Sequence, residues 1–582
     1  MISPSEQQVL ASVSLDEPWK LVETFSTWVR EHPNDVNRAM DHVVERLRAF
    51  GVPVTVHEPQ LYLSLPGKAR VEANGKTFRA KPPAYSADAR HGLEGELVYI
   101  AANQADDIDT IFDKKLDRKG AQQARARGKI VISEGYASPG LVSQFEELGA
   151  VGAIAINPGV DIHWGICTSV WGTPDLDDLP RKPKIPALAV NNPDGKALIE
   201  LANQGARVTI YADMEEGWFK SKLPVVEIKG AQEPDKFVLL HGHLDSWDVG
   251  VGDNAVGDAT MLEIARVLWQ HKDKLARSVR IAWWPGHSTG RYAGSTWFAD
   301  AFAIDLEENC VAQINCDSPG CRWATEFTEL SRMSETDTFI SEVIQDIANK
   351  KAVGERPHRA GDYSFNNIGI SSYFMLSSTM TPEKRADMGY YAVGGCGANI
   401  AWHTENDTIE IADRDILLRD IKVYLSAVFR NATAEFLPFD WRLTAKEFLR
   451  TIDRYQGKAG DRFDLSPSRE AAEGLLHSLE TFYRDVGSKK IPAREANRII
   501  MDLARILVPI NYTRVPRFRH DPALTIPPLP TIATATELSD FDEQTLGFAL
   551  TQLRRGQNRL VSALRDAARL ARSEERLARA AA

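Results

Sequence analysis

The spacing of apolar residues divides the chain into regions with different expected secondary structure. Residues from about 16 to 50 carry apolar positions at helical spacing, whereas short β-rich runs dominate from about 90 to 215. From about 225 to 430, expected strands alternate with expected helices, which is typical of a doubly wound α/β sheet. After about 455 the apolar spacing is almost wholly helical. The pattern predicts an α/β core with a compact β-rich insertion, followed by a helical region.

One stretch of the α/β region places polar side chains directly after a buried strand. The run at 237–240 is wholly apolar, as expected for a strand covered on both faces. Three candidate metal ligands follow it: His243, Asp245 and Asp253. In open α/β sheets, ligands bind at the carboxyl ends of the strands, and imidazole with carboxylate suits a cation such as zinc. The alternative interpretation is a polar loop of solvated turn residues.

Two later strand ends supply further candidates. Asp317 follows the apolar strand expected at 311–316, and His403 lies in a polar stretch at 400–408. The order along the chain is then His-x-Asp, Asp, Asp, His. A repeated choice of metal-binding residue types at strand ends favours a metal site over a solvated loop.

Composition restricts the class of protein. A chain of 582 residues is too long for one hydrophobic core, so we expect two to four domains. The net charge of -11 argues against a nucleic-acid-binding protein, which would carry a basic face. We see neither a secretory signal nor the roughly 18 uninterrupted apolar residues of a membrane span. Five cysteines without a CxxC pair argue against a disulfide framework, so we expect a cytoplasmic protein that does not bind membranes.

The motifs HLDSWDVGVGDNAVG at 243–257 and WHTENDT at 402–408 resemble those of the zinc aminopeptidase and glutamate carboxypeptidase family. That family also contains the transferrin receptor, and the resemblance covers most of the chain. It implies a doubly wound mixed α/β sheet with a metallopeptidase-like core. The implied domains are a catalytic domain over 1–88 and 218–455, a protease-associated insertion over 89–217, and a helical, transferrin-receptor-like dimerisation domain over 456–582. A homodimer is therefore expected.

The resemblance also implies roles for individual residues. His243, Asp253 and Asp317 match the ligands of one metal ion. Asp253 matches the ligand shared with a second ion, which His403 would also bind, and Asp245 matches the carboxylate that orients the His243 ring. We expect one or two divalent ions per chain, with zinc as the expected metal. Two such ions about 3.5–4 Å apart would hold a hydroxide and polarise a carbonyl.

One segment departs from the family pattern. Family peptidases carry two adjacent glutamates after the strand at 279–283, of which the first is the general base and the second a metal ligand. Here residues 284–295 read WPGHSTGRYAGS, without a carboxylate. Three interpretations remain open: His287 replaces a glutamate as ligand or base, the site keeps one metal, or the site is inactive as in the receptor branch.

Other candidates lie in loops near the expected pocket. Tyr390 or Tyr391 could donate a hydrogen bond to a tetrahedral oxyanion, a role that family peptidases give to a tyrosine. The candidates for substrate contact are Arg291, Arg359, Asp362 and His163. An arginine could hold a carboxylate in a forked pair, with a solvated loop arginine as the alternative.

These observations predict a metal-dependent hydrolase of an amide or related C–N bond in a small molecule or short peptide. Metal-activated water would be the nucleophile. One alternative is a non-catalytic, receptor-like binding protein on a peptidase scaffold. Another is a lyase or an acyl transferase on the same scaffold, because loss of the glutamate base disfavours ordinary peptide hydrolysis.

Overall fold

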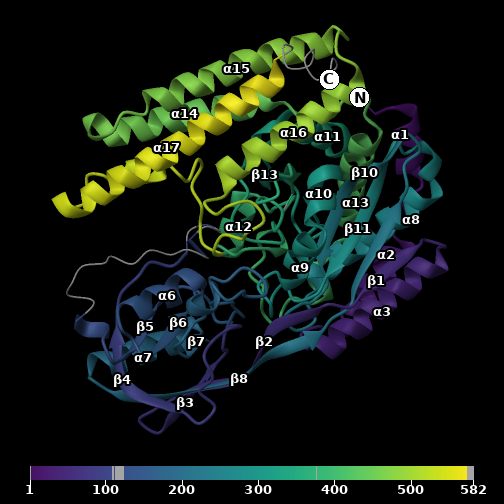
Figure 1. Ribbon diagram of the computed structural model, residues 1–582. Coiled ribbons are helices and arrows are strands. Elements are labelled where there is room, and N and C mark those ends of the chain that lie inside the picture. Colours follow the sequence, from purple (N-terminus) through teal and green to yellow (C-terminus); the bar gives the residue numbers. More distant parts are fainter. Residues whose placement is uncertain (1, 106, 108–109, 112–123, 375, 573–582) are drawn as a thin grey trace.

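Two large β-sheets and a layer of C-terminal helices organise the chain (Figure 1). The computed structural model describes residues 2–105, 107, 110–111, 124–374 and 376–572. Parts of the predicted insertion, at 106, 108–109 and 112–123, and of the predicted C-terminal region, at 573–582, lie outside these residues.

The first sheet, here called the core sheet, has six strands in the described part of the chain. Their order is β1 (Val54–His57), β9 (Leu223–Ile228), β11 (Arg277–Trp284), β10 (Glu233–His243), β12 (Cys310–Asn315) and β15 (Ser372–Tyr373). β10 pairs in parallel with β11 and β12, whereas β9 pairs antiparallel with β1 and β11. The predicted mixed α/β sheet is therefore confirmed, with β10 at its centre.

Helices cover both faces of the core sheet. Alternate residues of β10 point to opposite sides, so that Val238 and Leu240 join one apolar cluster while Phe237 and Leu239 join another. The first cluster includes residues of α1 (Pro4–Ala11), α2 (Asp16–Phe25), α3 (Pro33–Ala49), α8 (Val256–Gln270), α11 (Asp337–Ala348) and α13 (Arg414–Thr433). The second includes residues of α9 (Ala293–Ala301) and α10 (Ala303–Asn309). Burial on both faces explains the continuous apolar run at 237–240.

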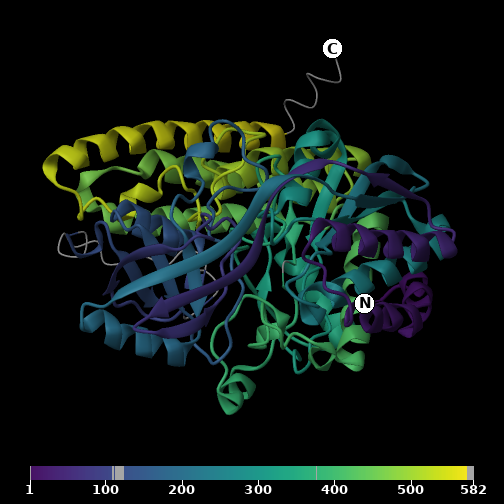
Figure 2. The ribbon, with the colours of Figure 1, turned by 90° about the horizontal axis from the view of Figure 1, so that it is seen from below.

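The second sheet has seven strands among the described residues. Their order is β3 (Lys76–Ala80), β2 (Gln60–Ala73), β8 (Arg207–Lys220), β4 (Leu93–Tyr99), β5 (Ile130–Glu134), β6 (Gly152–Ile156) and β7 (Ala187–Val190). The helices α6 (Pro139–Glu147) and α7 (Asn192–Asn203) pack against it. The long antiparallel pair β2–β8 runs from this sheet to the core (Figure 2). This sheet thus takes strands from both sides of the boundary predicted at residue 88.

Four long helices form the C-terminal layer at the top of Figure 1. They are α14 (Trp441–Ala459), α15 (Ser466–Gly487), α16 (Ala493–Tyr512) and α17 (Glu543–Ala571). Leucines of α15 and α17, such as Leu479 and Leu560, are buried in the cluster that also contains one face of the core sheet. The layer begins at Trp441, before the boundary predicted at 456, because α14 packs as part of it.

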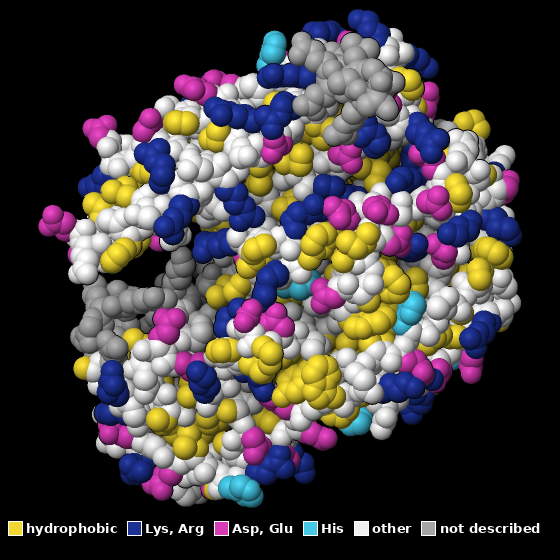
Figure 3. All heavy atoms as spheres, viewed as in Figure 1, with side chains coloured by type: hydrophobic (Ala, Val, Ile, Leu, Met, Phe, Trp, Pro, Cys, Tyr) yellow, Lys and Arg dark blue, Asp and Glu magenta, His cyan; other side chains and the backbone are white. Residues whose placement is uncertain are grey.

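The chain also contains smaller elements. They are the parallel pair β13 (Phe327–Ser331) and β14 (Ala352–Glu355), and the short helix α12 (Pro382–Met388). Across the described residues, no helix has both the length and the apolar character needed to cross a membrane. On the face in Figure 3, basic and acidic side chains are interspersed.

Candidate metal centre

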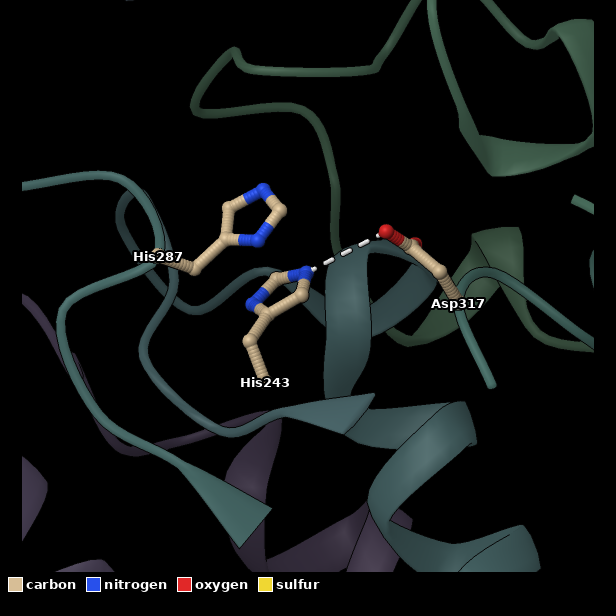
Figure 4. A group of neighbouring side chains, drawn as sticks. All are labelled: His243, His287 and Asp317. Carbon is tan, nitrogen blue, oxygen red and sulfur yellow. Dashed lines mark ion pairs between the residues drawn. The ribbon is translucent and has the colours of Figure 1, made fainter. Parts of the chain in front are cut away.

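The candidate ligands meet at the carboxyl edge of the core sheet. His243 is the last residue of β10, Asp317 follows β12, and the segment with His287 follows β11. These three strands are parallel neighbours, so their ends deliver the three side chains to one place. All three side chains are buried. Among the residues that the structure describes, they form a group whose ligand atoms lie within 4.8 Å of one another (Figure 4).

The carboxylate of Asp253 lies between two imidazoles. Its Oδ1 is 3.0 Å from His243 Nε2, and its Oδ2 is 3.1 Å from His403 Nε2. Asp317 Oδ2 lies 3.4 Å from His243 Nε2. The structure therefore brings together His243, Asp253, Asp317 and His403, and Asp253 has the central position.

The chemistry of these groups fits a cation. His243 Nε2 and Asp253 Oδ1 are buried and face one another, but neither makes a hydrogen bond within the described residues. Burial lowers the pKa of His243, but contacts with Asp253 and Asp317 outweigh it and raise that pKa well above its usual value. A divalent cation could take the place of the proton that this arrangement favours.

His287 lies inside the cluster. Its ring stacks on that of His243 with centroids 3.8 Å apart, and both rings are drawn in Figure 4. His287 Nδ1 is 2.9 Å from Asp362 Oδ2, while Asp362 Oδ1 accepts a hydrogen bond of 2.7 Å from Ser295 Oγ. Burial raises the pKa of Asp362, but the charge and hydrogen bond of His287 outweigh it, so the pKa is lowered. Asp362 is therefore an ionised partner that fixes the His287 ring.

Asp245 acts differently from the expectation. The His243 ring is held through Nδ1 by the main-chain carbonyl of Asp245, at 2.8 Å, and not by its carboxylate. The carboxylate instead accepts hydrogen bonds of 2.9 Å from the backbone amides of His287 and Ser288. Asp245 thus ties the segment after β11 to the loop after β10, because the turn at Gly286 brings two successive amides toward it.

Two residues that the sequence reasoning missed hold the loop between His243 and Asp253. Asp407 accepts hydrogen bonds from the backbone amides of Gly252 and Asp253, at 2.7 and 2.9 Å, and burial raises its pKa to about 7. Asp407 could have been identified from the sequence, because it lies in the WHTENDT motif. Arg30 is fully buried and donates to the carbonyls of Leu244 and Val249, at 2.9 and 2.8 Å. No local pattern could have indicated it, because these partners are more than 200 residues away.

A small cavity of about 30 Å³ opens onto the cluster. Besides Asp253, His287, Asp317 and His403, it is lined by Ile166, Arg291, Tyr292, Ala360, Gly361, Leu376, Gly394 and Trp402. Arg291 is fully buried, and its guanidinium lies 4.8 Å from the centre of the Tyr292 ring. The Tyr292 ring contacts the His287 ring edge-on at 4.8 Å. Arg291, a candidate for substrate contact, therefore lines the cavity.

Other predicted site residues lie elsewhere. Neither Tyr390 nor Tyr391 is among the described residues that line the cavity. The hydroxyl of Tyr391 lies 2.9 Å from His163 Nε2, and His163 Nδ1 is 2.7 Å from the carbonyl of Trp402. Burial lowers the pKa of His163 to about 3, which keeps it neutral. His163 thus supports the cavity wall from behind Trp402.

Arg359 also has structural partners instead of a place at the cavity. Its guanidinium donates to the carbonyl of Asp521 at 2.6 Å and lies 3.5 Å from the centre of the Trp171 ring. The guanidinium also donates to the carbonyls of Tyr363 and Pro522, each at 3.4 Å.

Several known proteins resemble this chain over part of its length. Residues 225–428 match the family model of peptidase family M28. Among curated relatives, the chain is 26% identical to a probable glutamate carboxypeptidase VP8 of Zea mays over 477 residues, covering 69% of this chain and 64% of the relative. It is 28% identical to leucine aminopeptidase 2 of Trichophyton equinum over 297 residues, covering 48% and 54%. The matches thus span less than two thirds of the length of these relatives.

Solved structures show the same fold. An aminopeptidase from Aneurinibacillus sp. strain AM-1 aligns with a TM-score of 0.53 at 18% identity, covering 73% of this chain and 96% of that one. A zinc aminopeptidase from Bacillus subtilis gives 0.53 at 18%, covering 75% and 97%. These two structures share the fold of this chain, at whose core the buried His–Asp cluster lies. The region that matches the peptidase family M28 model, residues 225–428, contains the candidate ligands His243, His287 and Asp317.

Proposed function

We propose that this protein is a metal-dependent hydrolase that cleaves an amide or related C–N bond in a short peptide or small molecule. The observation that carries the proposal is the position of Asp253, whose two carboxylate oxygens lie 3.0 and 3.1 Å from His243 and His403. Asp317 and His287 complete the cluster. Its relatives include enzymes described as carboxypeptidases and aminopeptidases, which supports a peptide as the substrate class.

The proposed ligands are His243, Asp253, Asp317, His287 and His403. Their imidazole and carboxylate groups favour zinc over calcium or magnesium, which prefer oxygen ligands. When bound, such an ion supplies a nucleophilic hydroxide at neutral pH and polarises the carbonyl of the substrate. One ion or two per chain are both compatible with this set of side chains.

We assign His287 the role of a ligand that compensates for the missing glutamate. Asp362 is a charged acceptor at Nδ1, so Nδ1 carries a proton and Nε2 is left with its lone pair. A carboxylate that orients an imidazole toward a cation is a common arrangement in metal sites. In a site with one ion, the same Nε2 could instead act as a general base.

Arg291 is the proposed contact for an anionic group of the substrate. It is buried, lines the cavity beside His287 and carries a planar guanidinium, which pairs well with a carboxylate. A substrate with a carboxylate near the scissile bond would meet a complementary charge in the cavity wall.

The domain roles are part of the proposal. The second sheet with its helices is proposed to be a protease-associated insertion, and the helical layer to serve in a homodimer. The resemblance to the family and the helical content after residue 455 support this assignment.

Metal analysis followed by a peptide screen tests the proposal. Protein purified without chelator should contain zinc or another divalent ion, and turnover of dipeptides or N-acylated amino acids should stop on chelation and return when metal is added. Protein that binds no divalent ion would overturn the proposal and favour a receptor-like role. The missing carboxylate base favours one further candidate, an acyl transferase or lyase. Mass spectrometry of the products would distinguish it, because hydrolysis adds one water to the substrate.

A further inference from the structure

A loop of the proposed insertion holds one of the candidate ligands from two sides. The backbone amide of Trp164 donates to the carbonyl of His403 at 2.8 Å. In return, His403 Nδ1 lies 3.0 Å from the carbonyl of Trp164. A carbonyl can only accept, so Nδ1 must carry the proton, and in the neutral ring Nε2 keeps its lone pair. That Nε2 is the atom 3.1 Å from Asp253 Oδ2.

These reciprocal bonds also restrain an uncommon backbone conformation. His403 has a φ of 58°, in the left-handed region that residues other than glycine rarely adopt. Such a conformation persists only where its surroundings hold it. The pair of bonds to Trp164 therefore acts on both the backbone and the ring of His403.

The side chain of Trp164 contacts the loop between His243 and Asp253, a second segment that carries candidate ligands. Its indole stacks on Trp247 with centroids 5.1 Å apart and an interplanar angle of 12°, and its Nε1 donates to Asp248 Oδ2 at 3.0 Å. Trp247 and Asp248 lie in the loop between His243 and Asp253.

Lys81 connects Trp164 to the segment that carries His403. Lys81 Nζ lies 4.7 Å from the centre of the Trp164 ring and 2.9 Å from Glu405 Oε2, two residues beyond His403. Trp164 itself is half-buried.

We propose that Trp164 is a positioning residue through which the insertion sets the metal affinity of the site. Its indole is anchored on the loop that leads to Asp253, and this anchoring fixes the carbonyl that orients His403. Trp164 thus connects the His403 segment to the loop between His243 and Asp253, although it is not itself a candidate ligand. The inference rests on the proposed metal site and adds that full metal affinity requires the loop that carries Trp164.

Cobalt titration of the full chain tests this inference. Metal-free wild type, Trp164→Ala and Trp164→Phe would be titrated with Co²⁺, followed by visible absorption and by competition with a chelator. Trp164→Ala should weaken Co²⁺ binding about 10–100-fold, the usual cost of losing a partner of a metal ligand. Trp164→Phe can still stack on Trp247 and should lose less. Trp218→Ala is the matched control, because Trp218 is 61% exposed on β8.

A double-mutant cycle separates positioning from general stability. If Trp164 acts through His403, Trp164→Ala should cause no further loss of Co²⁺ affinity in a His403→Ala background. Equal losses in both backgrounds, or wild-type affinity in Trp164→Ala, would overturn the inference. Wild-type protein that binds no Co²⁺ would overturn the proposed function itself, and this inference with it. Thermal unfolding of the metal-free variants shows whether each is folded.

Discussion

Whether the role of a residue could be predicted from the sequence depends on whether its partners are local or distant. His243 could be predicted as a ligand, because it ends an apolar strand and the local sequence shows this. His287 could be predicted to face the pocket only through the resemblance that exposed the missing glutamates. The use of the Asp245 carbonyl in place of its carboxylate could not be predicted, since it depends on the path of the loop. The role of Trp164 could not be predicted either, because its partner His403 is 239 residues away.

The ligand assignment predicts specific losses of metal. His243→Ala and Asp317→Ala should each lower metal content per chain, since each removes a side chain that contacts the central cluster. Elemental analysis of protein purified without chelator measures this. His477→Ala and Asp453→Ala are matched controls, because both residues lie on exposed helix surfaces of the C-terminal layer. Full metal content in both cluster variants would show that the ions bind elsewhere.

His287 has its own prediction. As a ligand, His287→Ala should lose metal and activity together, whereas as a base it should keep metal and lose about 10²–10⁴-fold in kcat. Asp362→Asn keeps the imidazole but replaces the charged acceptor at Nδ1, so we expect metal affinity to fall about 10–100-fold. Metal content and turnover measured on both variants decide between the roles. Unchanged values in His287→Ala would make it a loop histidine without function.

At the scale of elements, the core sheet was predictable and the long strands were not. The apolar run of β10 and the strand ends on β12 are local signals, so strand positions and ligand placement could be predicted together. β2 passes through Pro66 and Gly67, residue types typical of a turn, and continues to Ala73, because the register shifts between Pro66 and Ala69 and the pairing with β8 resumes. That continuation depends on a partner about 140 residues away, so no local turn signal could show it.

One junction between elements predicts a pH effect on stability. Glu335 accepts a hydrogen bond from Thr444 of α14 and is buried, and burial raises its pKa from 4.5 to about 7. Because the folded-state pKa is above the unfolded value, the folded state binds more protons between these pH values. Stability is therefore lost as pH rises from about 4.5 to 7. Glu335→Gln should be more stable than wild type at pH 8, by about 1–3 kcal/mol, and similar to it near pH 4.5.

Urea unfolding of both proteins across this pH range measures the difference. Glu473→Gln on α15 is a suitable control, since the Glu473 side chain is 50% exposed and should change stability little at any pH. A constant difference between Glu335→Gln and wild type from pH 4.5 to 8 would show that Glu335 does not titrate in this way.

At the scale of the whole molecule, the metal centre lies where separate parts of the chain converge. The core sheet supplies His243 and Asp317, and the loop with Trp164 comes from the second sheet. The sequence predicted these parts from changes in periodicity, but not their contacts, which depend on pairs of residues hundreds of positions apart. This arrangement explains why a cavity of about 30 Å³ is enclosed by residues from several segments.

The C-terminal layer leads to the prediction of a homodimer. Phe548 on α17 is 70% exposed, and Gln544 and Thr551, at helical spacing from it, are also exposed and uncharged. An exposed aromatic side chain with uncharged neighbours on the same helix face is typical of the centre of an interface. Sedimentation equilibrium at micromolar concentration should therefore give a dimer, and Phe548→Asp should weaken it at least about tenfold by placing a charge in the contact. Trp218→Asp, which changes a residue of similar exposure on β8, should leave the dimer intact. A wild-type monomer at tens of micromolar, or a Phe548→Asp dimer as tight as wild type, would assign the layer a role within its own chain.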